Sequence, residues 1–284
     1  MSLKPFICAL VVALASLSAA AQNLTVDQII AKNIAAKGGL EKLKAQKSVR
    51  ATGRMTLGPG LEAPIVMEQK RPGNFRFELT LQGLTAVQAY DGQTGWQIMP
   101  FQGKKEPEVM GEDDLKDAQE QADFDGPLVD YKEKGNKVEL VGHEQVEGSD
   151  TYKLKVTLKN GDVRYIYLDA DTFLEVKEES KRTIRGTERE GETTFGDYKE
   201  EGGVMMAHSF ESGAKGSPQK QRITIEKVEI NPTIEDARFK MPAAPKPEGN
   251  KPAAKPENPP TETKPADKKP TETKPPATKP PGRR

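Results

Sequence analysis

The chain has 284 residues, of which 43 are basic, 43 are acidic and only 35% are hydrophobic. The zero net charge is an average, because residues 22–243 contain 32 basic and 38 acidic side chains and are therefore acidic. We expect no nucleic-acid partner, since neutralising phosphates requires a basic surface.

Residues 1–21 have the layout of a cleavable secretory signal. A single charge, Lys4, precedes an apolar run at residues 6–17, and small residues follow up to Ala21. This layout is typical of a signal peptide, and the apolar run is too short for a membrane-spanning helix. We predict cleavage after about Ala21 and a periplasmic location. Cleavage removes the chain's single cysteine, Cys8, so neither a disulfide nor a thiol nucleophile is expected in the mature protein.

The last segment, residues 244–284, differs from the rest in composition. It contains 12 prolines and 10 basic residues against 5 acidic ones, and none of its side chains suits a hydrophobic core. We predict a disordered tail rich in proline and lysine, which leaves residues 22–243 as one folded domain. A solubilising spacer is the simplest interpretation of this tail. Contact with the cell wall or another anionic surface is the alternative.

The mature segment is predicted to begin with two short helices. Thr25 and Gln28 fit a capping box, and apolar residues recur at helical spacing over residues 26–34. Two consecutive glycines end this helix, and a second helical piece follows over residues 40–45. Each helix presents an apolar side that can pack on a sheet.

After Lys47 the hydrophobic pattern changes from a helical period to a period of two. Apolar and polar side chains alternate over residues 75–82 and 152–158, which makes one face apolar and leaves the other solvated. Turn signals such as Asn160-Gly161 separate the alternating segments. About 10–11 strand candidates at short spacing predict an antiparallel meander.

One segment interrupts the strands. Residues 112–124 are helix-like, with acidic residues in the first turn, where the helix dipole favours negative charge. The apolar stripe of this segment is thin. We therefore expect it to lie loosely on the sheet, as a movable flap.

The residues that could support catalysis form no recognisable set. The two histidines, His143 and His208, lack the spacing of a metal site, and Asp169-Ala170-Asp171 lacks the glycine and distal glutamate of a calcium loop. No glycine motif that could hold phosphate follows a predicted strand. We predict a protein that is not an enzyme and binds no metal or cofactor. An enzyme acting on envelope glycans or lipids is the alternative.

The most informative feature is an apolar sheet face in a domain that is rich in methionine. Methionine and aliphatic side chains can repack around an irregular ligand such as an acyl chain, although ordinary core packing is the alternative. Few and weak helices are predicted to cover a whole sheet face, so a groove is expected there. The residues that we expect to line the groove are Met55, Leu57, Phe75, Phe77, Leu79, Leu81, Trp96 and Ile98.

The succession of these segments resembles the LolA/LolB-like periplasmic lipoprotein carriers, also called outer membrane lipoprotein-sorting proteins. The resemblance rests on the helical run at residues 29–44 that leads into the strand at 48–57. It also rests on the hairpin and following strand at residues 152–176 and on the closing segment at 230–242. Together these segments extend over about residues 24–242.

The resemblance implies a mainly β fold with α-helices: an antiparallel, unclosed half β-barrel of about 10–11 strands, with the N-terminal and central helices covering its concave face. It also implies a monomeric periplasmic carrier that binds the acyl chains of lipoproteins, or other lipids, without a cofactor. An inner-membrane donor and an outer-membrane acceptor are the implied partners. The alternative is a regulatory, sensor or scaffold module of the same fold that binds a protein partner in the envelope.

Overall fold

The computed structural model of the chain describes residues 24–184 and 186–243. The predicted signal peptide and the predicted tail lie outside these residues, so both of them, and the domain boundaries, stay predictions. No helix of the described part is long and apolar enough to cross a membrane.

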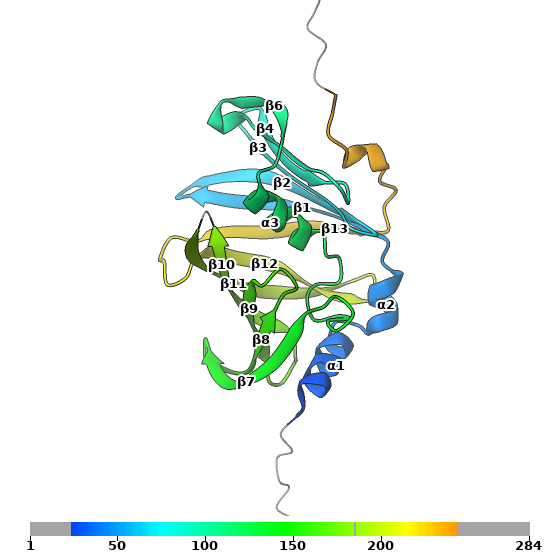
Figure 1. Cartoon of the computed structure of the whole chain (residues 1–284), viewed down its shortest axis with the longest axis vertical. Coiled ribbons are helices and arrows are strands. Elements are labelled where there is room, and N and C mark those ends of the chain that lie inside the picture. Colours follow the sequence, from blue (N-terminus) through cyan, green and yellow to red (C-terminus); the bar gives the residue numbers. More distant parts are fainter. Residues whose placement is uncertain (1–23, 185, 244–284) are drawn as a thin grey trace, which may run out of the picture. The chain divides into compact units, whose positions relative to one another are not determined.

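Within the described residues, thirteen strands form a single antiparallel sheet (Figure 1). The strands are β1 (Ser48–Gly58), β2 (Leu61–Lys70), β3 (Asn74–Leu81), β4 (Leu84–Tyr90), β5 (Gly95–Met99), β6 (Lys104–Val109), β7 (Lys137–Val146), β8 (Ser149–Thr157), β9 (Val163–Asp169), β10 (Glu175–Ile184), β11 (Thr187–Glu201), β12 (Val204–Ala214) and β13 (Gln221–Ile230).

The sheet consists of two meanders joined at its centre. Strands β1 to β6 follow one another outward on one side, and β13 to β7 follow one another on the other, so that β6 and β7 form the two free edges. The expected unclosed, antiparallel architecture is confirmed, with more strands than the 10–11 expected. Strands with few apolar residues, such as β6, show little alternation in the sequence, which accounts for the difference.

The pairing of β1 with β13 joins the meanders and brings together segments from opposite ends of the domain. It runs from Val49 opposite Ile230 to Thr56 opposite Arg222, with a shift of register beside Gly53. A Cβ atom on Gly53 would lie only 2.0 Å from the backbone oxygen of Thr224. Only glycine therefore allows the two strands to approach so closely.

The helices α1 (Val26–Ala36), α2 (Leu40–Ala45) and α3 (Glu112–Gln121) lie on the same face of the sheet, which we call the inner face. The capping box of α1 is confirmed, since the Thr25 side chain accepts a hydrogen bond from the Gln28 N–H and the Gln28 side chain accepts one from Thr25. Ile29 and Ile30 of α1 are buried against Leu154 and other apolar residues of β8 and β9. This cluster covers the inner face of the second meander.

Helix α3 spans the inner face between the two meanders. Its apolar side packs on the first one, where a Cβ on Gly95 of β5 would lie 2.8 Å from the Leu115 Cδ1 atom. Its polar side meets the second one, where Glu120 forms ion pairs with Arg164 of β9 and Arg182 of β10. The apolar contact is as small as the sequence indicates, and these charged contacts were not foreseen. That α3 moves stays a prediction.

The outer face of the first meander is covered by the closing segment of the domain. The Trp96 indole Nε1 donates a hydrogen bond of 2.7 Å to the backbone oxygen of Phe239, and both side chains are fully buried. Arg238 beside it forms ion pairs with Glu68 and Glu78 on the same face. Residues 231–243 thus act as a strap across the outer face.

Replacing Gly53 with alanine is expected to lower the free energy of unfolding by about 2 kcal/mol, because overpacking against a rigid neighbour costs about 1–3 kcal/mol. Gly196→Ala is the matched control, since this glycine also lies in a strand and nothing is within 4 Å of its Cβ position. We expect this control to keep the stability or to raise it slightly. Urea denaturation measures both variants, and equal losses in the two would contradict the close approach of β1 and β13.

Candidate functional site

An apolar cavity lies on the inner face of the sheet, where the two meanders meet. Its volume is about 350 Å³, and residues of α2, of strands from both meanders and of the loop after α3 line it. The side chains of its apolar wall include Met67, Phe195, Met206, Phe210 and Val228. All five are only half-buried, although they lie on the covered face. The helices therefore do not fill the space above the centre of the sheet.

Charged side chains at the margin of the cavity are paired with one another. Lys37, at the end of α1, lies 2.8 Å from the carboxylate of Glu175 in β10. Glu178, three residues further along, accepts a hydrogen bond of 3.0 Å from Arg164. Burial raises the pKa of Glu178 although Arg164 opposes this effect. These pairs allow charged groups to border an apolar space, because each carboxylate has a cationic partner.

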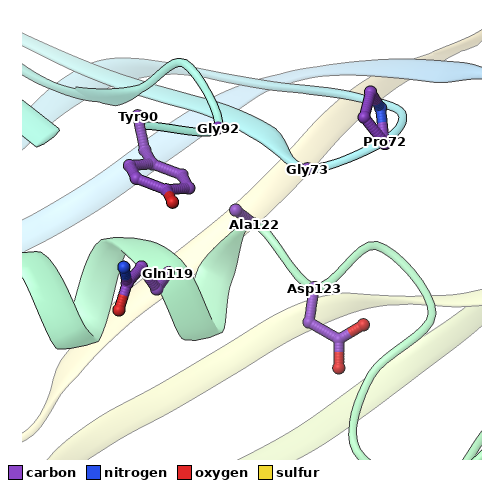
Figure 2. Close-up of a pocket in the computed structure, with 7 residues that line it drawn as sticks. All are labelled: Pro72, Gly73, Tyr90, Gly92, Gln119, Ala122 and Asp123. Atoms are coloured by element: carbon purple, nitrogen blue, oxygen red, sulfur yellow. The ribbon is translucent and has the colours of Figure 1, made fainter. Parts of the chain in front are cut away.

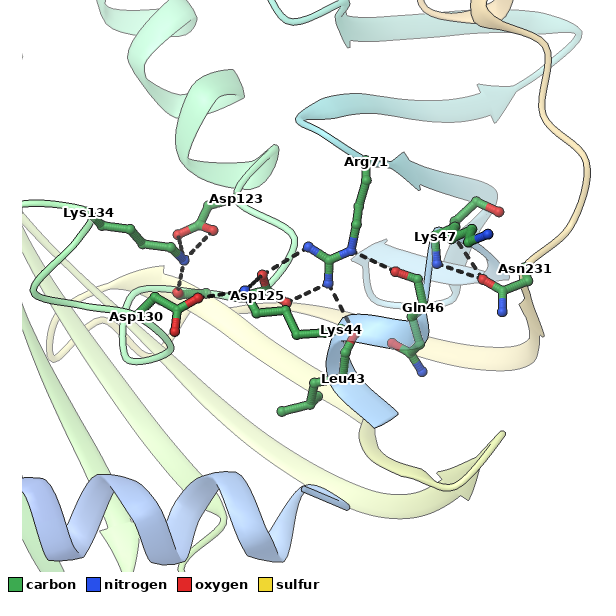
Figure 3. A network of polar contacts seen from close by, with 12 residues as sticks. Leu43, Lys44, Gln46, Lys47, Arg71, Asp123, Asp125, Asp130, Lys134 and Asn231 are labelled. Carbon is green, nitrogen blue, oxygen red and sulfur yellow. Dashed lines mark hydrogen bonds and ion pairs between the residues drawn. The ribbon is translucent and has the colours of Figure 1, made fainter. Parts of the chain in front are cut away.

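The roof of the cavity is held by the guanidinium group of Arg71, in the turn between β2 and β3 (Figure 3). Arg71 donates to both carboxylate oxygens of Asp125, at 2.9 and 2.6 Å, and to the backbone oxygens of Gln46 at 2.7 Å and Leu43 at 3.0 Å. Lys44 also donates to Asp125, at 2.7 Å. One charged group thus joins α2, the β2–β3 turn and the loop after α3.

Asp125 is the anionic centre of this network. Burial alone would raise the pKa of Asp125, but the hydrogen bonds and charges of Arg71 and Lys44 outweigh it and lower the pKa to about 2. The carboxylate is therefore ionised at neutral pH and binds both cations. The roof combines this charge pairing with apolar packing, since Leu43 of α2 and Val129 of the loop after α3 share one buried cluster.

A second hollow, of about 460 Å³, lies between the end of α3 and two turns of the first meander (Figure 2). The Tyr90 ring projects toward the end of α3, where Gln119 lies, and Asp123 lies beyond Ala122. None of the polar side chains that line this hollow is buried. It is therefore a weaker candidate for a ligand site than the apolar cavity.

The structure brings six of the eight predicted groove residues to the inner face. Five of them, Met55, Leu57, Phe77, Leu79 and Leu81, belong to one apolar cluster that extends over β1, β2, β3 and β13. The sixth, Phe75, is almost completely buried. This cluster continues the apolar surface of the cavity through Met67, which lies opposite Phe77. That these six residues contact a ligand stays a prediction.

Trp96 and Ile98 do not join the other six. The strand register places Trp96 opposite Ala89 and Ala89 opposite Arg76, so Trp96 shares a face with Arg76. Arg76 follows Phe75 in β3, so Trp96 and Ile98 lie on the face opposite to Phe75. Trp96 and Ile98 belong instead to a separate apolar cluster of the outer face, beneath the strap at residues 231–243. Alternation within one strand shows which residues share a face, but not which of the two faces is the inner one.

None of the eight predicted groove residues lines the cavity itself, so sequence reasoning missed the residues that do. Phe195 lies in the mostly polar strand β11 and Phe210 in the polar second half of β12, and they pack edge to face with 5.9 Å between ring centroids. Gln46 is buried at the end of α2, where no sequence pattern marked it. Two adjacent methionines, Met205 and Met206, were the one available signal, since both line the cavity.

Among the described residues, no group of three or more His, Cys, Asp or Glu side chains is placed to hold a metal ion. Neither protein-family models nor curated proteins match the chain significantly.

Solved structures do match it. A LolA superfamily protein from Nitrosomonas europaea is 14% identical, aligns over 77% of this chain and 98% of its own, and has a TM-score of 0.51. The chain therefore has a LolA-like fold. A DUF1329 family protein from Desulfovibrio piger is 13% identical over 76% of this chain and 97% of its own, with a TM-score of 0.48. A protein from Vibrio parahaemolyticus, described as an outer membrane lipoprotein-sorting protein domain, is 15% identical over 74% and 94%, with a TM-score of 0.45.

The LolA-like fold confirms the architecture that the resemblance implied. At 14% identity the likeness to the Nitrosomonas europaea protein concerns the fold alone. The function is therefore inferred from the chemistry of the cavity and its roof.

The Asp125 carboxylate is expected to stabilise the fold in a manner that depends on pH. Its pKa falls from an ordinary 3.8 to about 2 on folding, so its contribution is complete above about pH 5 and is lost as the pH falls toward 2. Asp125→Asn should therefore lower the free energy of unfolding by about 2 kcal/mol at pH 7. The difference from the wild type should narrow between pH 4 and pH 2. Urea denaturation across this range measures it.

Asp130→Asn is the control for this prediction. Asp130 also pairs with Lys44, at 2.6 Å, but its side chain is 42% exposed. We expect this variant to lose less than about 0.5 kcal/mol at any pH, because an exposed ion pair contributes little. A loss in Asp125→Asn that does not vary with pH would contradict the assignment.

Proposed function

We propose that this chain is a periplasmic carrier that holds an acyl chain of a lipoprotein, or of a similar amphiphile, in the apolar cavity. One observation carries the proposal: methionine and phenylalanine side chains border an unfilled space on the inner face and stay only half-buried there. Such side chains adapt to a flexible apolar ligand. The LolA-like fold and the predicted signal peptide support the same function and location.

The ligand needs a carrier because exposing its hydrocarbon to water is unfavourable. Each exposed methylene group costs about 0.8 kcal/mol, so an acyl chain does not cross an aqueous compartment unprotected. The carrier takes its ligand from an inner-membrane donor and passes it to an outer-membrane acceptor. The direction of transfer follows from the affinities of the successive partners for the same ligand.

The contacts that close the roof support repeated opening. The loop after α3 is held by Asp125 and Arg71, and α3 itself by Glu120 with Arg164 and Arg182. Water can replace such charged contacts when they separate, whereas a packed apolar interface would expose its whole area. Only Ala118 of α3 is buried, so α3 can separate from the sheet at a small cost in exposed apolar surface. The loop after α3 is anchored more firmly, because Leu128 and Val129 are buried in apolar clusters.

Filling the cavity should abolish ligand binding. The mature chain, freed of lipid by denaturation and refolding, is expected to bind a fluorescent acyl probe. Met206→Trp should weaken this binding by at least about tenfold, because the larger side chain occupies the space of the ligand. Titration of the probe by fluorescence measures the affinity, and urea denaturation shows that the variant folds.

Val141→Trp serves as the matched control, because Val141 is 54% exposed and lies on the edge strand β7, outside the cavity lining. Its affinity for the probe should equal that of the wild type. The proposal fails if the refolded wild type binds no acylated probe. It also fails if Met206→Trp folds and binds as tightly as the wild type. A single protein partner whose binding survives the filled cavity would instead support the regulatory module.

Removing the charge that holds α3 should loosen the cover. Glu120→Gln takes away the anion that lies between Arg164 and Arg182, so we expect faster amide hydrogen exchange in α3 and faster release of the probe. Glu112→Gln is the control in the same helix, because Glu112 is 85% exposed and pairs only with Lys116, at 3.4 Å. Unchanged exchange and release in Glu120→Gln would show that these ion pairs do not hold the cover.

A further inference from the structure

The lining of the cavity contains one polar side chain that the protein leaves without a hydrogen bond. Gln46 is only 4% exposed, and its Nε2 atom has no partner among the described residues. The other polar side chains of the lining have partners. For example, Gln69 donates to the backbone oxygen of Gln121 at 2.6 Å. A buried amide without a partner is costly, so a ligand that completes its hydrogen bonding gains affinity.

The backbone of Gln46 is fixed at the junction of α2 and β1. Its N–H donates to the backbone oxygen of Leu43 at 3.3 Å, and its own oxygen accepts from the Nε atom of Arg71 at 2.7 Å. The side-chain amide takes no part in the Arg71 network (Figure 3). The backbone is therefore held at the wall of the cavity, and the side chain is almost completely buried there.

The volume of the cavity limits the number of chains that it holds. A methylene group takes up roughly the volume of a water molecule in the liquid, about 30 Å³. A cavity of about 350 Å³ therefore accommodates on the order of a dozen carbon atoms. This volume matches one acyl chain of moderate length.

The charged groups around the cavity offer no free cation to an anionic head group. Lys37, the one cation of the described lining, already pairs with Glu175. The cations near the other two carboxylates of the lining, Asp125 and Glu178, are paired with them. A carboxylate or phosphate on the ligand would lose hydration without gaining a cation, whereas an uncharged carbonyl loses less.

We infer that the cavity selects a ligand with a single acyl chain joined through an uncharged carbonyl, as in an ester or an amide, and that the Gln46 amide donates a hydrogen bond to this carbonyl. This inference rests on the proposed function, because it assumes that the cavity holds an acyl chain. It adds the number of chains, the charge of the linkage and the residue that recognises it.

A matched pair of glycerol lipids tests the role of Gln46. Monolauroylglycerol and its dodecyl ether analogue have the same chain length and differ by the carbonyl oxygen. The wild-type chain is expected to bind the ester about tenfold more tightly than the ether, and Gln46→Leu should bind both equally. Gln46→Met, with a side chain of similar length, is the second variant and should lose the same preference. Displacement of a fluorescent acyl probe measures each affinity.

Two further lipids test chain number and charge. Dilauroylglycerol, with two chains, and laurate, with an anionic head, should each bind more weakly than monolauroylglycerol. The inference is overturned if the wild type binds ester and ether equally, if both Gln46 variants keep the preference, or if either of these two lipids binds as tightly as the ester. In each of these cases the proposed function stands, because an acyl chain is still bound. Binding of none of the lipids would overturn the proposed function as well.

Discussion

The architecture of this protein depends on the pairing of β1 with β13. Each meander alone would leave a free strand at its inner end, and the two become one sheet only because these strands, far apart in the chain, lie side by side. The absence of a side chain at Gly53 permits this contact, since a Cβ there would lie 2.0 Å from a backbone oxygen of β13. The same junction forms the floor of the cavity, where Ala51 and Val228 are direct partners and both line it.

The sheet is joined in this way but not closed, and its helices do not cover the whole inner face. Helix α1 covers the second meander and α3 covers part of the first, while the centre is roofed by α2 and the loop after α3. Arg71 holds that roof by hydrogen bonds to Asp125 and to the end of α2. The apolar walls shelter hydrocarbon from water, and water can replace the ion pairs of the roof when the cover opens.

Much of the fold could be predicted from the sequence, because it follows from local patterns. Alternation over residues 75–82 places Phe77 and Leu79 on one apolar face, and Thr25 with Gln28 begins α1. The site could not be predicted in the same way. Trp96 alternates as regularly as its neighbours, yet it lies on the outer face, since only the pairing of strands decides which face the helices cover.

The residues of the site come from segments that are distant in sequence, and no local pattern connects them. Gln46 lies at the end of a six-residue helix, while Phe195 lies in the mostly polar strand β11 and Phe210 in the polar second half of β12. Their function as a wall appears only when β1, β2 and β9 to β13 are placed around one space. The charges of the roof are equally non-local, since Arg71 and Asp125 are separated by the whole of β3 to α3.

The central claim is that this cavity receives an acyl chain, and the methionine methyl groups report on it directly. In the mature chain, labelled with ¹³C at the methionine methyls, titration with monolauroylglycerol is followed by NMR. We expect shifts for Met67 and Met206, whose side chains lie on the inner face at the cavity, and none for Met99 and Met241, which lie outside the lining. Shifts confined to Met99 and Met241, or no shift in any methionine at saturating lipid, would contradict it.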